Sequence, residues 1–328
     1  MHKGLIVGAV CATLGIVAVW AATTGNQAKE DTTMPTVYFT RDISPAGLMK
    51  AYTASGWKPA AGKVGIKMST GEPPSSNYLR PELIGDLVKS VNGTIVECNT
   101  AYAGRRNNSA EHWKVVREHG FLDVAPVDIQ DEEGNMELSV PNPLRISENY
   151  VGSHFANYPS YIILSHFKGH QMAGCGGALK NISIGFASSM GKAWIHSGGT
   201  SKTNAWGGEQ VAFLDSMADA SAAVINYVGA DKMLYINVLN RISIDCDCNG
   251  HPAEPDIHDI GILVSTDPVA IDQAGIDMVS SAPNNKALMD RIAQQNGLRT
   301  IEAAQKHNLG STKYKLVDLD NETENGGN

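Results

Sequence analysis

The sequence predicts an α/β fold with a mainly parallel sheet flanked by helices, in one large domain or in two lobes. Two observations predict it. Short apolar, β-branched runs alternate with helical segments along the chain, which is the order of strand–helix–strand units. Several runs, such as residues 161–164, are apolar at every position, which is typical of strands buried on both faces. With 42% hydrophobic residues in 328, the chain can also bury a substantial core.

The first half of the chain shows this alternation with recognisable helix starts. Ser44 and Pro45 suit the cap and first turn of a helix, Pro81 opens another, and Ser109 is the expected cap of a third. The acidic residues 131–135 indicate a turn, and residues up to 151 read as irregular or hairpin-like. We expect helices at 44–56, 81–89 and 109–119, and strands at 36–39, 64–68, 94–98 and 124–129.

The second half repeats the pattern after a glycine-rich stretch. Apolar residues recur at helical spacing over residues 209–227, which predicts an amphipathic helix. Asp267 and Pro268 begin a helix that runs to Val279, and two more helices follow. We expect strands at 161–164, 233–238, 242–246, 260–265 and 314–319.

The N-terminus predicts export. Residues 4–22 are uncharged and largely apolar and follow Lys3, as in a signal peptide or a single spanning helix. The expected organisation is a signal peptide or membrane anchor at 1–24, a linker at 25–35, the α/β domain at 36–320 and a loose tail at 321–328. The protein would be periplasmic or membrane-anchored facing outward, and would contact the membrane only through this first segment.

Net charge and composition limit the classes of binding partner that we expect. The formal net charge is −8 and only 6% of residues are aromatic. No basic block interleaved with aromatic residues occurs, so a nucleic-acid partner is not expected. A small-molecule or anionic ligand is the expected partner.

Residues 165–181 concentrate glycines and titratable groups after a buried strand, where open α/β sheets place their ligands. A plain connection with turn glycines is the alternative, although such connections are rarely this long. Two other loops, at 99–108 and 245–259, also follow apolar strands. If these strands are parallel, the loops share one edge and bring together His166, His170, Cys175, Lys180, Arg105, Arg106, Cys246, Asp247, Cys248, His251 and Asp259.

Four cysteines follow the N-terminal segment: Cys98, Cys175, Cys246 and Cys248. Export favours disulfides. Cys246 and Cys248, placed on a strand, would point to the same face and would be strained if joined to each other. Pairing with the other two cysteines, metal ligation by all four, and simple packing on one strand face all remain open.

Several motifs resemble the family catalogued as domain of unknown function 362, often labelled an iron–sulfur-centre protein. They lie at residues 71–73, 79–81, 99–106, 168–181, 245–248 and 259–270. The resemblance implies a metal ion or an iron–sulfur cluster as cofactor, although residues 197–208 stand where many members carry a ferredoxin-like C-x₂-C insertion. The candidate cofactor-binding residues in these motifs are Asn99, Thr100, Lys168, Gly174, Gly176, Gly177 and Asn181.

A more distant pattern is similar to that of the nickel-pincer lactate racemase family. His170 and Lys180 are ten residues apart and His196 follows sixteen later, as in that family. The resemblance implies a covalent lysine link to a nickel-pincer nucleotide, a proton-transferring His170 and nickel ligation by His196. The sequence departs from the pattern at Gly176 and Ala178, where the family has serine and glycine.

Three functions follow from these residues. The first is an enzyme with His170 as acid–base, Lys180 as anchor or electrostatic clamp, and Arg106 beside them. The second is a metal-binding or redox protein that uses Cys98, Cys175, Cys246 and Cys248, with His196 as a further ligand. The third is a module whose glycine amides and basic side chains hold an anion. We rank the enzyme first.

Overall fold

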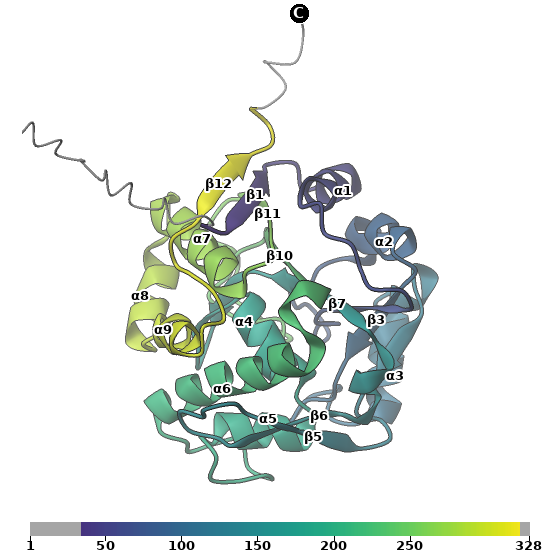
Figure 1. Ribbon diagram of the computed structural model, residues 1–328, viewed down its shortest axis with the longest axis vertical. Helices are drawn as coiled ribbons and strands as arrows, with labels where there is room; N and C mark the ends of the chain where they lie inside the picture. The colour runs from purple at the N-terminus through teal and green to yellow at the C-terminus, as the bar shows by residue number, and fades with distance from the viewer. Residues whose placement is uncertain (1–33, 322–328) are drawn as a thin grey trace, which may run out of the picture. The chain divides into compact units, whose positions relative to one another are not determined.

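Eight strands form one mixed sheet in the computed structural model, which describes residues 34–321 (Figure 1). The expected signal peptide or anchor, most of the linker and most of the tail lie outside these residues. Seven strands run in one direction and β11 opposes them. The spatial order is β12 (Lys315–Asp318), β1 (Thr36–Thr40), β11 (Gly261–Ser265), β10 (Met233–Leu239), β7 (Ser160–His166), β2 (Val64–Lys67), β3 (Gly93–Glu97) and β4 (Val127–Ile129).

Helices cover both faces of this sheet, because its central strands are apolar on both sides. On β7, Ile162 and Leu164 join one core cluster with α1 and α2, whereas Tyr161 and Ile163 join the cluster formed with α6, α7 and α9. The fold is therefore an α/β fold in a single domain, as the sequence predicts. The helices are α1 (Pro45–Ala54), α2 (Pro81–Ser90), α3 (Ser109–Glu118), α4 (Ala178–Lys180), α5 (Ser189–His196), α6 (Gln210–Val228), α7 (Pro268–Ser281), α8 (Lys286–Gln294) and α9 (Arg299–Lys306).

The capping signals hold with one correction. The Ser44 hydroxyl accepts from the backbone N–H of Gly47 at 3.1 Å, and Asp267 caps α7. The cap of α3 is Asn108 rather than Ser109, since the Asn108 side chain accepts from the N–H of Glu111 at 3.0 Å. Within residues 34–321 no helix combines the length and apolarity needed to cross a membrane.

The strand expected at 242–246 is wrong. Only Ile242 makes an isolated bridge, to Ile257, and the following residues form turns. The alternation of Ile242, Ser243 and Ile244 is typical of a strand. The chain turns instead, because the carboxylate of Asp247 is buried in the interior. Residues 135–152 form the expected hairpin, β5 (Asn135–Ser139) with β6 (Glu148–Gly152).

The glycine-rich stretch is a hairpin and a helix turn rather than one long loop. β8 (Lys168–His170) pairs with β9 (Gly174–Gly176), and α4 follows at once. Gly174 adopts a φ of +77°, which glycine tolerates better than other residues. A Cβ on Gly177 would lie 2.2 Å from the Asp272 carboxylate, so this position also requires glycine.

Candidate functional site

The carboxyl ends of β2, β3, β7 and β10 meet at one edge of the sheet, and the segments after them enclose a cavity. Parallel direction places these ends together. The cavity measures about 60 Å³. We call it the inner cavity, and its charged lining is Lys67, Glu97, Arg106, His166, Lys168, Lys180, Lys192 and Asp247.

One wall of the inner cavity is a buried network around Glu97. Its carboxylate accepts from Lys67 Nζ at 2.9 Å and lies 3.4 Å from Arg106 Nη1. Arg106 Nε also donates to Glu72 at 3.1 Å. Burial alone would raise the pKa of Glu97, but Lys67 and Arg106 bring it down to about 2. The network is therefore ionised at neutral pH and holds Arg106 in place.

The opposite wall is held by Asp247, which lies between the two cysteines of the 245–248 motif. Its carboxylate accepts from His166 Nδ1 and from Lys168 Nζ, both at 2.8 Å. His166 Nε2 lies 2.6 Å from the carbonyl oxygen of Asn240, so the ring is held from both sides. Burial would raise the pKa of Asp247, but Lys168 and His166 hold it well below its usual range. Asp247 thus fastens its loop to β7 and β8.

Lys180 differs from the other cavity lysines because its amine has no hydrogen-bond or ion-pair partner among residues 34–321. Burial, and then the nearby charge of Lys168, lower the pKa of Lys180 to about 7. Lys192 is buried and its pKa is also lowered, but its Nζ donates to the carbonyl of Ala187 at 2.6 Å. A substantial fraction of Lys180 is therefore a neutral, unpaired amine at neutral pH.

Asp272 on α7 fixes the position of Lys180. Its carboxylate accepts from the backbone N–H groups of Ala178 and Leu179 at 2.7 and 2.9 Å, which caps α4. It also accepts from Asn237 at 2.8 Å. Because Lys180 ends this short helix, the cap sets where its side chain begins.

A second, larger pocket of about 370 Å³ adjoins the inner cavity. We call it the outer pocket. Tyr102 and Cys248 line both spaces. A disulfide joins Cys246 to Cys248, with the two Cα atoms 5.2 Å apart. The remaining lining includes His170, Met172, His196, Trp206 and Asp245.

The disulfide corrects the expectation that these two cysteines would not pair. The expectation assumed a strand, on which both side chains would be held in an extended backbone. The segment instead turns around the buried Asp247, which brings both sulfur atoms to one side. Cys98 and Cys175 remain free thiols.

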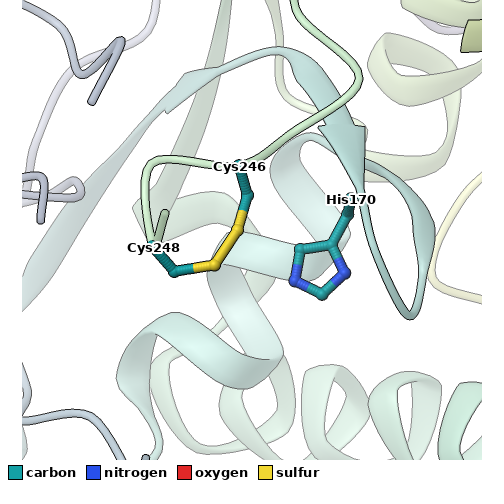
Figure 2. Close-up of side chains that lie close together, drawn as sticks. All are labelled: His170, Cys246 and Cys248. Carbon is teal, nitrogen blue, oxygen red and sulfur yellow. A yellow bond between two sulfur atoms is a disulfide. The ribbon is translucent and has the colours of Figure 1, made fainter. Parts of the chain in front are cut away.

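The His170 ring stands beside the disulfide (Figure 2). Its Nδ1 accepts from the backbone N–H groups of Met172 and Ala173, at 3.2 and 2.9 Å. A backbone N–H can only donate, so the proton of the neutral ring is on Nε2, the nitrogen turned toward the sulfur atoms in Figure 2. Burial, and then Lys180, hold the pKa of His170 well below its usual range. His170 is therefore a neutral donor.

His196 has the opposite tautomer. Its Nδ1 lies 2.7 Å from the Lys192 carbonyl, which can only accept, so Nδ1 carries the proton and Nε2 holds a lone pair. Burial lowers the pKa of His196 to about 4. Of the two outer-pocket imidazoles, His196 is the one with a ring nitrogen free to accept a hydrogen bond or to ligate a metal.

Most of the predicted site residues line the inner cavity, and the others lie elsewhere. The inner cavity is lined by Cys98, Thr100, Arg106, His166, Lys168, Gly176, Gly177, Lys180, Asn181, Asp247 and Cys248. Asn99 instead bonds to Ser109 and His112, and Arg105 is paired with Glu118. The described side chains able to hold a metal together, with ligand atoms within 4.8 Å, are His170, Cys246 and Cys248. Cys98, Cys175 and His196 lie outside that group, so a site built from all four cysteines is not formed.

Sequence reasoning missed three charged residues that line the inner cavity. Lys67 and Glu97 end strands β2 and β3, and Lys192 lies on α5. A charged residue at the end of an otherwise apolar buried strand is the signal that could have identified the first two, because such a charge needs a buried partner.

Comparison with known proteins identifies a family for this chain. The model of a family described as "Domain of unknown function (DUF362)" matches residues 64–277. No curated protein matches the chain. Among solved structures, the lactate racemase apoprotein from Thermoanaerobacterium thermosaccharolyticum is similar with 13% sequence identity and a TM-score of 0.37. The similarity covers 61% of this chain and 50% of that one, so the chain spans about half the length of that structure.

Proposed function

This chain belongs to the DUF362 family, and from its site we propose an enzyme that binds a small anionic ligand in the inner cavity and uses Lys180 as a neutral amine. The observation that carries the proposal is the unpaired Lys180 amine, whose pKa is about 7. A desolvated amine of this kind can take up a proton or attack an electrophilic carbon near neutral pH.

The charges around the cavity favour an anion. Two carboxylates, Glu97 and Asp247, line it against a larger number of basic groups. Each carboxylate is already engaged by two basic side chains. The surplus positive charge therefore lies with Lys180 and Lys192, which no described carboxylate pairs. An anionic group bound between them would meet basic side chains that no described carboxylate neutralises.

The cavity volume limits what enters. About 60 Å³ accommodates several water molecules, or one carboxylate or phosphate group. The body of a larger ligand would extend past Tyr102 and Cys248 into the outer pocket, where His170 donates and His196 accepts. Charge recognition and proton transfer would thus use adjoining spaces.

Reductive trapping with glyoxylate tests the proposal, because glyoxylate is a small anion with a carbonyl group. The Lys180 amine would form an imine with loss of water, and cyanoborohydride would reduce its C=N bond to a stable amine. We expect peptide mass spectrometry at pH 7 to find the adduct on Lys180 before exposed Lys286, and inorganic phosphate to slow it. Equal labelling of the two lysines, without protection by phosphate, would contradict the proposal.

A second candidate is metal binding by His170, Cys246 and Cys248, favoured by their closeness. It requires the reduced cysteines, because a disulfide leaves no thiolate for a soft or borderline metal. It also requires His170 to move its proton to Nδ1, which faces two N–H donors. Metal analysis of protein purified under reducing conditions, with Cys246→Ser as the control, tests this candidate: one metal ion lost in the variant would support it.

We also propose that the protein is exported, as residues 4–22 predict. A disulfide within residues 246–248 is of the kind that oxidising compartments maintain, which supports the proposal. Cell fractionation with N-terminal sequencing of the mature protein checks it. Recovery of uncleaved protein from the cytoplasm alone would contradict export.

A further inference from the structure

The Cys246–Cys248 disulfide does not have an obvious structural task. Cross-links stabilise mainly by restricting the unfolded chain, and this one encloses a single residue. The loop is already fastened through the Asp247 carboxylate to His166 and Lys168. The Asp247 carbonyl also accepts from the N–H of Glu72 at 2.8 Å. The disulfide therefore adds little stability to a loop that Asp247 already fixes, which points to a chemical role instead.

We propose that this disulfide is a redox-active pair that exchanges with a small thiol bound in the outer pocket. This activity is separate from the amine chemistry proposed for Lys180. The outer pocket, at about 370 Å³, lies within the range of small-molecule sites. Both sulfur-bearing residues line it.

The two sulfur atoms differ in access, which assigns their roles. Cys246 is 4% exposed, whereas Cys248 is partly exposed and lines the inner cavity as well. An incoming thiol therefore reaches Cys248 more readily. In thiol–disulfide exchange a thiolate attacks one sulfur atom and the other sulfur atom departs as a thiolate. Here Cys248 Sγ is the sulfur attacked and Cys246 Sγ is the leaving group.

His170 is placed to stabilise the departing sulfur. Its Nδ1 is occupied by the N–H groups of Met172 and Ala173, so the nitrogen facing the disulfide carries a proton (Figure 2). This Nε2–H can donate to the thiolate that forms on Cys246. His170 is thus a catalytic residue of the exchange, because its hydrogen bond reaches the leaving sulfur itself.

The exchange moves two electrons from two small thiols to the protein disulfide. A small thiolate attacks Cys248 Sγ, the Cys246–Cys248 bond breaks, and its electron pair passes to Cys246. A second thiolate attacks the mixed disulfide and releases Cys248 as a thiolate. The two small thiols leave joined as a disulfide, having lost two electrons, and the protein dithiol has gained them. The two thiol protons pass to solvent or to the reduced cysteines.

Cys98 and Cys175 provide internal controls. Burial raises the pKa of Cys98 above its usual range and that of Cys175 to about 12. Both are therefore poor nucleophiles in the folded protein. Native alkylation after reduction should label Cys246 and Cys248 first, whereas buried Cys98 should react only after denaturation and partly exposed Cys175 only slowly, because its pKa is raised.

The first test equilibrates the full chain with buffers of reduced and oxidised glutathione, followed by native alkylation and peptide mass spectrometry. We expect Cys246 and Cys248 to become labelled together as the buffer becomes more reducing. In single variants, Cys248 in Cys246→Ser should form a mixed disulfide with oxidised glutathione about tenfold faster than Cys246 in Cys248→Ser, because it is more accessible. Equal rates, or a pair that stays unlabelled in reduced glutathione, would overturn the proposal.

The second test addresses His170. His170→Leu removes the donor and should slow reduction of the disulfide by about 10- to 100-fold, the effect of one hydrogen bond to a charged group. His170→Gln keeps an N–H near the Nε2 position and should restore most of the rate. Thermal unfolding confirms that both variants are folded. Equal rates in the two variants would show that His170 acts only through packing.

Discussion

The inner cavity and the outer pocket share Tyr102 and Cys248, yet they are built on opposite electrostatic principles. The inner cavity is a set of charges in which Glu97 and Asp247 are each shared by two basic groups. The outer pocket contains two imidazoles kept neutral, one donating and one accepting. Under the proposed function, recognition of the anion and transfer of protons would take place on either side of Tyr102 and Cys248.

The contrast between paired and unpaired charges shows how the fold can keep the Lys180 amine neutral among other basic side chains. Burial, and then repulsion from Lys168, lower the pKa of Lys180, while Glu97 and Asp247 keep their basic partners. Had Lys180 its own carboxylate, as Lys168 has, it would be a fixed cation and could not exchange a proton near pH 7. The missing partner is thus the feature that separates a structural charge from a reactive one.

The largest expected effect comes from breaking the inner network at Asp247. Asp247→Ala leaves His166 and Lys168 buried without their carboxylate, and should lower the free energy of unfolding by about 3–5 kcal/mol. Urea denaturation measures the loss. Asp247→Asn keeps an acceptor oxygen and should lose less, whereas equal losses would show that packing rather than charge holds this loop.

A matched pair of lysine variants compares a partnered charge with an unpartnered one. Lys168→Met removes a lysine that pairs with Asp247 and should destabilise the protein. Lys180→Met removes a desolvated amine that has no described partner, and should leave stability unchanged or raise it at pH 7, since methionine fills similar space without a charge. Urea denaturation of both variants checks the contrast, and losses of equal size would contradict it.

The pH dependence of stability sharpens the assignment of Lys180. Its pKa is about 7 in the folded protein and 10.5 in the ordinary, unfolded reference, so the unfolded chain binds more protons between these values. The contribution of Lys180 therefore makes the free energy of unfolding rise with pH from about 7 to 10.5. The difference between wild type and Lys180→Met isolates this slope, and Lys286→Met serves as an exposed control. A difference that does not vary over that range would contradict the lowered pKa.

The smallest effect on stability is expected in the outer pocket. Trp206 is 59% exposed, so Trp206→Ala should change the free energy of unfolding by no more than about 0.5 kcal/mol. Because its ring lines the outer pocket beside Tyr102, the variant should instead weaken exchange of the disulfide with glutathione. Loss of stability without a change in exchange would show that the tryptophan belongs to the fold.

The fold and the meeting of three loops could be predicted because they depend on hydrophobic patterning and on strand direction. Residues 161–164 and 233–238 read as buried strands, and parallel strands place their following loops together. The strand predicted at residues 242–246 is wrong, because two isoleucines on either side of a serine give the alternating pattern of a strand. Their backbone is instead held by single contacts, such as the Gly169 N–H to the Ser243 carbonyl at 2.8 Å.

The chemistry of the site could be predicted only in part. His170 and Lys180 were identified from their place after a buried strand, but their protonation depends on neighbours distant in the sequence or set by the hairpin. The Nδ1 contacts of His170 come from the turn between β8 and β9, and the pairing of Lys67 with Glu97 joins two strands. No spacing rule contains these contacts, since they arise from tertiary packing.

Asp272 links a distant part of the chain to the site. It lies on α7, outside both compartments, yet it holds the first turn of the segment that ends at Lys180. A random mutagenesis screen for loss of activity should therefore recover positions in the C-terminal third of the protein that never meet a ligand. Such hits would report a misplaced amine rather than a second site.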